Sequence, residues 1–114
     1  MNINRGHLVV VDFNPRVNTK PGKVRPAVVV QSDLITQADY PSTNVVPATS
    51  KTLEDAGLLR LRLPKGTCGL ELESDLLVAQ LIAVANLSFK KDLGPLPEDL
   101  FNELLVRLRI VLDL

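Results

Sequence analysis

The stretch that decides the fold is KVRPAVVVQ, residues 23–31. Its run of β-branched residues is typical of a buried β-strand. Because Pro26 has no N–H to donate to a sheet, we expect it at the first position of that strand. Proline disfavours the helical conformation for the residue before it, which predicts an extended Arg25. A guanidinium fixed there suits an anion, although this stretch alone favours an ordinary exposed arginine.

The totals predict one domain, 1–114, with its own core. The chain has 114 residues, 46% of them hydrophobic, which is enough for a core that needs no disulfides. Its one cysteine, Cys68, excludes an internal disulfide and fits a reducing compartment. No apolar run has the length of a membrane span, and residues 1–5 carry no signal-peptide pattern. We therefore expect a soluble cytoplasmic protein with no membrane partner.

Charge is unevenly distributed along the chain. The formal net charge is zero, but residues 1–30 hold five cations against one acid, a net charge of +4, and the remainder carries −4. The basic part suits phosphate groups, while the acidic remainder keeps the protein in solution. Scattered surface charge is the plain alternative, since four surplus charges are few.

The apolar segments predict a mostly antiparallel α+β domain. We expect strands at residues 7–13, 26–31, 44–49 (interrupted by Pro47), 58–63 and 76–85, a loop or edge segment at 69–74, a short helical turn at 34–38 and a turn at 90–95. Several short strands followed by one terminal helix predict a compact small barrel.

The last segment is the clearest helix. Pro97 suits the first helical position, and Glu98 and Asp99 suit the first turn, where the helix dipole favours anions. Apolar residues then recur at i, i+3, i+4 and i+7 as far as Leu112. This apolar face is wider than one stripe, so we expect the helix to pack on a second subunit as well.

Three polar elements are candidates for a binding site. Residues 15–22 form a basic segment with two prolines and a glycine, which favours a binding loop or an ordinary hairpin tip about equally. The cluster Thr49-Ser50-Lys51 offers two hydroxyls and a cation that suit a phosphate. Gln80 interrupts an apolar run, and since a buried glutamine needs partners, it either braces a loop or faces a site.

Several kinds of chemistry have no motif here. Cys68 and His7 do not have the spacing of a metal site, and no glycine-rich phosphate loop precedes a helix, so we expect no metal and no cofactor. A nuclease that uses two histidines is excluded because His7 is the only one. Catalysis would have to rest on Arg, Lys, Thr, Ser or a carboxylate.

Four blocks, in order and at matching intervals, resemble the MazF/PemK (Kid) family of toxin endoribonucleases. They cover nearly the whole chain: RG at 5–6 with VDFNP at 11–15 and RPAVVV at 25–30, VVPATS at 45–50, Ser74 with Gln80, and the terminal helix at 96–112.

The resemblance implies an SH3-like antiparallel β-barrel of the MazF/CcdB type with a C-terminal α-helix, which forms a homodimer. It implies the toxin of a type II toxin–antitoxin system, neutralised by a cognate antitoxin. Such toxins cleave single-stranded mRNA at short sequences by attack of the ribose 2′-hydroxyl, leaving a 2′,3′-cyclic phosphate. The implied catalytic pair is Arg25, which would stabilise charge, and Thr49, which would donate to a non-bridging oxygen. No general base is assigned. The expected RNA-binding residues are Thr19, Lys20, Lys23, Ser50, Lys51 and Gln80.

The chain departs from the family pattern in its acidic positions. The first loop has Asn18-Thr19-Lys20-Pro21 where the family has an acid, and Ala79 precedes Gln80 where the family favours one. This leaves two alternatives open: a degenerate module that binds RNA and antitoxin without cutting, or a gyrase poison of the related CcdB type. The second would act through the terminal helix and would not need Arg25 or Thr49.

Overall fold

The computed structural model describes residues 1–13 and 23–114, and these ranges form one sheet with helices packed around it. The elements are β1 (His7–Asp12), β2 (Val24–Val29), α1 (Asp33–Gln37), β3 (Ser42–Thr49), η1 (Gly57–Leu59), β4 (Arg60–Leu63), η2 (Thr67–Gly69), β5 (Ser74–Leu77), η3 (Val78–Gln80), β6 (Ile82–Ala85), η4 (Asn86–Ser88), β7 (Phe89–Pro95) and α2 (Glu98–Leu112), the η elements being 3-10 turns.

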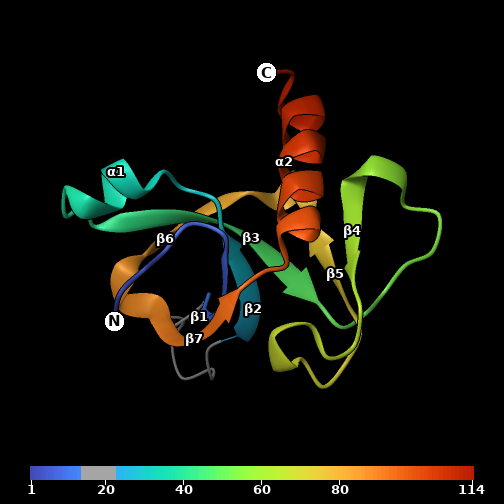
Figure 1. Ribbon diagram of the computed structural model, residues 1–114, viewed down its shortest axis with the longest axis horizontal. Coiled ribbons are helices and arrows are strands. Elements are labelled where there is room, and N and C mark those ends of the chain that lie inside the picture. The colour runs from blue at the N-terminus through green and yellow to red at the C-terminus, as the bar shows by residue number, and fades with distance from the viewer. Residues whose placement is uncertain (14–22) are drawn as a thin grey trace.

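The strands pair antiparallel in the order β4-β5-β3-β2-β1-β7, and β6 pairs with β3. Figure 1 shows the sheet curling around itself, with α2 standing beside β4 and β5. Within the described residues the end strands β4 and β7 do not pair with each other, so the sheet is barrel-like but not closed. This confirms the expected antiparallel α+β architecture with a C-terminal helix.

Both faces of the sheet are buried. Alternate residues of one strand point to opposite faces. Val28 therefore packs in one cluster with Leu104 and Leu108 of α2, while Ala27 and Val29 pack in a second cluster on the other face. A strand buried on both sides reads as a continuous apolar run. This is why residues 27–29 carry no polar residue.

Helix α2 begins one residue later than the sequence predicts, with Pro97 as its N-cap and not its first helical residue, and it leaves part of its apolar surface exposed. Pro97 precedes the first helical residue, and Glu98 and Asp99 occupy the first turn. Leu104 and Leu108 are buried, whereas Val106, Ile110 and Leu112 are about half exposed. The apolar face is thus wider than the area that the sheet covers.

The start of β2 differs from the prediction. The strand begins at Val24, so Pro26 is its third residue and not its first. At Pro26, β2 pairs with β1 alone, because the pairing with β3 begins at Ala27. A residue without an N–H is tolerated there because one side of the strand is open.

The expected single strand at 76–85 is also wrong. It is two strands, β5 and β6, separated by the turn η3. Both pair with the same edge of β3, but Leu76 lies opposite Ala48 and Ile82 lies opposite Val45. Three extra residues must therefore leave the sheet between the two strands, and they do so in η3. The one polar residue of this run, Gln80, lies in η3, but a single polar residue in an apolar run does not by itself predict such a break.

Three other segments refine the expectations. The predicted turn at 90–95 is wrong, because these residues lie in β7, an edge strand paired with β1 through two register shifts. The segment contains turn residues, Gly94 and Pro95, but its charged residues are also how sheets protect an exposed edge. Pro47 does not interrupt β3, and the strand expected at 58–63 begins at Arg60 after η1. The short helical turn at 34–38 is confirmed as α1, and residues 69–74 join η2 to β5.

Candidate functional site

The register of the sheet brings Arg25 and Thr49 to equivalent positions on neighbouring strands. The last paired residues of β2 and β3 at this end are Ala27 and Pro47. Beyond them the strands separate, because β3 continues along β5, with Thr49 opposite Asp75. Arg25 and Thr49 each lie two residues past the last pair, at the mouth of the gap that opens between the strands.

A cavity of about 540 Å³ occupies this gap, and Arg25 and Thr49 both line it. Lys23, Ser50 and Lys51 line the same cavity. The sequence-predicted catalytic pair and three of the predicted RNA-binding residues therefore lie together. The remaining walls come from β1, β2, β3, the end of η2 and the segment after it, the start of β5, and β7: Val10, Val24, Pro26, Ala48, Gly69, Leu70, Glu71, Leu72, Ser74 and Leu93.

A second hollow of about 370 Å³ contains Gln80 and shares Lys23 and Arg25 with the first. Phe13, Pro47, Leu81 and Ile82 complete its lining. Gln80 is exposed and not buried, because η3 lifts it out of the sheet. The premise that it needs a buried partner was wrong, and of the two roles proposed for it, the position facing a site agrees with the structure.

The hydroxyl oxygen of Thr49 is restrained by the chain that follows it. Its Oγ1 accepts a hydrogen bond from the backbone N–H of Lys51 at 3.2 Å. This occupies one lone pair of the oxygen and leaves the O–H proton to donate elsewhere. Thr49 is half-buried, so a group entering the cavity can reach that proton.

The guanidinium of Arg25 forms no ion pair with any residue in 1–13 or 23–114. Residues 14–22 contain no aspartate or glutamate that might pair with it. A half-buried arginine whose donors are not neutralised by a carboxylate presents a planar fork to an anion. Together, Arg25, Lys23 and Lys51 place three cations around one cavity.

The chain matches, over residues 4–112, the family described as PemK-like, MazF-like toxin of type II toxin–antitoxin system. The chain belongs to this toxin family. It is 29% identical over 114 residues to Endoribonuclease MazF6 of Mycobacterium tuberculosis and to Endoribonuclease MazF2 of Mycobacterium bovis, with all of each chain covered.

Solved structures share the fold of this PemK/MazF-family toxin. A mycobacterial endoribonuclease in complex with its cognate antitoxin is 13% identical, with a TM-score of 0.78 over 99% of this chain and 97% of that one. MazF of Deinococcus radiodurans is 21% identical, with a TM-score of 0.76 over 98% and 97%. The expected MazF-type fold is therefore confirmed.

Two of the predicted RNA-binding residues, Thr19 and Lys20, lie outside the described residues. One charged residue of the cavity lining was not predicted as a site residue. Glu71 contributes a carboxylate to the lining, from an exposed position in the segment between η2 and β5. Nothing in the local sequence singles it out among neighbouring acids, because only the fold brings this segment across to Arg25.

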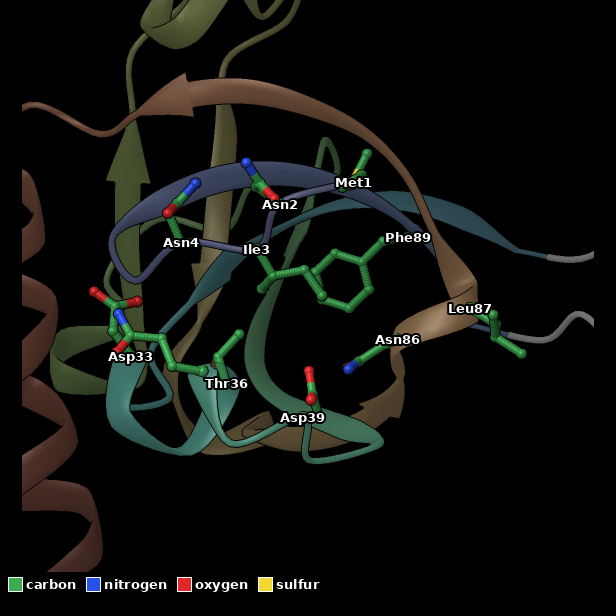
Figure 2. A pocket seen from close by; sticks show the side chains of 11 residues that line it. Met1, Asn2, Ile3, Asn4, Asp33, Thr36, Asp39, Asn86, Leu87 and Phe89 are labelled. Atoms are coloured by element: carbon green, nitrogen blue, oxygen red, sulfur yellow. The ribbon is translucent and has the colours of Figure 1, made fainter.

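The toxin has a larger hollow of about 690 Å³ at its N-terminal end, shown in Figure 2. It lies between residues 1–4, α1 and η4, with Ile3 and Phe89 in its floor and Asp33 and Asp39 on its rim. None of the described residues that line it is a lysine or an arginine. Its carboxylates would repel a phosphate, so this hollow is not suited to bind RNA.

No helix in residues 1–13 or 23–114 combines the length and the apolar character that a membrane crossing requires.

Proposed function

We propose that this toxin is an endoribonuclease whose active site is the cavity between β2 and β3. The observation that carries the proposal is that Arg25 and Thr49, from separate parts of the sequence, line one cavity together with Lys23 and Lys51. The family is one of toxins, and two relatives that match this chain along its whole length are named endoribonucleases. The substrate is single-stranded mRNA, cut at short sequences.

The nucleophile of the proposed reaction comes with the substrate. The ribose 2′-oxygen attacks the adjacent phosphorus and loses its proton, and the bond from phosphorus to the 5′-oxygen breaks as that oxygen takes up a proton. The products are a 2′,3′-cyclic phosphate and a 5′-hydroxyl. The protein must hold the reacting atoms in line and stabilise the charge that develops on the phosphorane.

Arg25 and Thr49 supply that stabilisation. The fork of Arg25 donates two hydrogen bonds to non-bridging oxygens, and the hydroxyl of Thr49 donates a third. An arginine stays protonated at any ordinary pH, so it does not serve as the base. Glu71 is a carboxylate of the same lining and is our candidate to accept the proton of the 2′-hydroxyl.

The strand is held on either side of the scissile phosphate. Lys23, Ser50 and Lys51 contact neighbouring phosphates in the larger cavity, and Gln80 contacts RNA in the adjoining hollow. Thr19 and Lys20 add contacts from the segment between β1 and β2. Because both hollows share Arg25, the bound strand would pass over that side chain from one to the other.

The partners of the toxin follow from the same proposal. The mycobacterial neighbour was solved with its cognate antitoxin, and MazF of Deinococcus radiodurans was solved with MazE. We propose that a cognate antitoxin binds this toxin, and that two copies associate through the exposed apolar side chains of α2. Since the substrate is mRNA, the site of action is the cytoplasm.

The test is to incubate purified protein with single-stranded RNA and to identify the ends of the products. We expect cleavage that leaves cyclic phosphates, and its loss in Arg25→Ala and in Thr49→Val. Arg5→Ala is the matched control, because Arg5 is exposed and stacks on Phe101 at 5.0 Å, away from the cavity. Full cleavage by Arg25→Ala would refute the proposed site.

The same variants separate the rival functions. RNA binding without cleavage by the unaltered protein would favour the degenerate module. Toxicity in cells that survives Arg25→Ala, with no effect on RNA, would favour a gyrase poison.

A further inference from the structure

A buried carboxylate lies behind the wall of the cavity. Asp75 is 1% exposed and is not among the residues that line the cavity, yet in the sheet it lies directly opposite Thr49. A buried charge is retained only when partners satisfy it. The partners of Asp75 are two arginines of β4 and one backbone N–H. A chain of hydrogen bonds connects these partners to Thr49.

Two of these bonds hold the segment that follows Thr49. Asp75 Oδ2 accepts from the backbone N–H of Leu53 at 2.9 Å and from Arg60 Nη1 at 3.2 Å. The same Nη1 donates to the backbone carbonyl of Lys51 at 2.9 Å. Residues 51 and 53 are therefore both tied to one buried ion pair, the first through its carbonyl and the second through its N–H.

The backbone of Lys51 also binds the proposed catalytic hydroxyl, that of Thr49. The backbone N–H of Lys51 donates to Thr49 Oγ1 at 3.2 Å, while its carbonyl accepts from Arg60. Fixing the carbonyl of Lys51 restricts the rotation of that residue's backbone, and this in turn fixes where its N–H points. The position of the Thr49 hydroxyl oxygen is thus restrained by a pair of charges that do not enter the cavity.

Arg62 plays a different part in this cluster. Its Nε donates to Asp75 Oδ1 at 2.5 Å, and its other nitrogens reach Glu54 and Glu73 at 3.1 Å. It holds the carboxylate in place from β4 but makes no recorded bond to the backbone of residues 49–53. The direct connection to Thr49 passes through Arg60.

We propose that Arg60 and Asp75 are positioning residues for catalysis: they hold the 49–53 segment so that the Thr49 hydroxyl points at the scissile phosphate. This inference rests on the proposed function, in which Thr49 stabilises the transition state. Neither residue touches RNA. Their effect is on the rate of the bound complex and not on the affinity for the strand.

The decisive variant is Arg60→Gln. It removes the bond to the Lys51 carbonyl but leaves Asp75 paired with Arg62 and Leu53, so the fold is retained. We expect kcat for single-stranded RNA to fall about tenfold, less than the 10²- to 10³-fold that deletion of a charge-stabilising donor costs. KM should change by less than about threefold, because the side chains of Lys23, Ser50 and Lys51 are all still present to contact the strand, although the backbone of Lys51 loses one hydrogen bond.

The design must separate positioning from general damage to the structure. Arg60→Gln is therefore also made in the Thr49→Val background, where a residue that acts only through Thr49 has nothing left to position. In that background we expect Arg60→Gln to change kcat by less than about twofold. The reason is that the effects of substituting two residues that act as a unit do not add. Asp75→Asn should lower kcat in the same direction as Arg60→Gln. Arg5→Gln and Asp92→Asn are the matched controls, the latter because the Asp92 carboxylate also binds a side chain, that of His7, and a backbone N–H.

Each outcome tests either the positioning role of Arg60 or the proposed active site itself. Unchanged kcat in Arg60→Gln, with Thr49→Val inactive, overturns the positioning role and leaves the proposed active site standing. An equal loss of kcat in the presence and absence of Thr49 overturns it as well, because Arg60 would then act elsewhere. Full activity of Thr49→Val overturns the proposed active site itself.

Discussion

The buried ion pair also makes a prediction about stability, tested by Asp75→Asn. The exchange keeps the volume of the side chain and removes its charge, which leaves Arg60 and Arg62 without their shared partner. Breaking a buried pair costs about 3–5 kcal/mol of unfolding free energy when the remaining charge is uncompensated, and here Arg60 loses its carboxylate while Arg62 keeps Glu54 and Glu73. Since the two arginine side chains are 24% and 30% exposed and can turn towards water, we expect a loss of about 3 kcal/mol at pH 7.

The pH dependence of this loss identifies its cause. Burial opposes the ionisation of Asp75, but hydrogen bonds from Arg62, the Leu53 N–H and Arg60 outweigh it and hold the pKa of the carboxyl below its ordinary value. A group with a lowered pKa stabilises the fold above its ordinary pKa and loses this contribution as the pH falls through the folded pKa. The difference between Asp75→Asn and the unaltered toxin should therefore be constant from pH 7 to pH 5 and shrink only below about pH 4.

Urea unfolding followed by far-ultraviolet circular dichroism measures this difference at pH 7, 5 and 3. Asp92→Asn is the control, because His7 and the Gly94 N–H bind that carboxylate at a side chain that is 34% exposed. We expect it to lose less than about 1 kcal/mol, as exposed pairs do. A loss in Asp75→Asn that is as large at pH 3 as at pH 7 would refute the reasoning, because it would come from packing and not from charge.

Four further predictions test other parts of the molecule. Leu104→Ala should lower the free energy of unfolding by about 2–5 kcal/mol, because Leu104 is fully buried between α2 and the sheet, and a smaller loss in urea would mean that the helix is loosely packed. Glu71→Gln should lower the rate of RNA cleavage without lowering affinity for RNA, and an unchanged rate would remove it as the candidate base. Lys23→Ala should weaken RNA binding and reduce the slope of log affinity against log salt by about 0.7, whereas Lys65→Ala, outside the cavity, should leave that slope unchanged. Ile110→Asp should shift sedimentation towards monomer, and sedimentation of the unaltered toxin as monomer at micromolar concentration would refute association through α2.

The sequence could predict that Arg25 and Thr49 lie close together, because their proximity depends only on where two neighbouring strands begin and end. An apolar run fixes β2, and the residues just before such a run lie at its edge. Thr49 ends the next long strand, and antiparallel neighbours bring the start of one strand to the end of the other. The resemblance supplied the choice of these two residues, and local pattern supplied their placement.

Contacts between segments that are distant in the sequence could not be predicted, because they depend on how the whole chain folds. Asp75 reads as a polar residue at the start of a strand, and nothing nearby shows that Arg60 and Arg62 reach it from β4. Glu71 looks like any exposed acid until the fold carries its segment across to Arg25. The break at η3 was equally hidden, since it depends on how two strands register on β3 and not on their own composition.

The net charge of zero conceals that, among the described residues, some cations are paired with acids at close range while others, including those that line the cavity, are not. In the described part of the chain, Arg60, Arg62 and Arg107 each bind at least one carboxylate within hydrogen-bonding distance. Arg25 and Lys23, which line both hollows, have no such partner among those residues. Acids paired at close range cancel the field of the arginines that shape the site, while the cations facing the cavity keep theirs. A phosphate approaching this toxin is therefore attracted to the cavity even though the whole molecule is neutral.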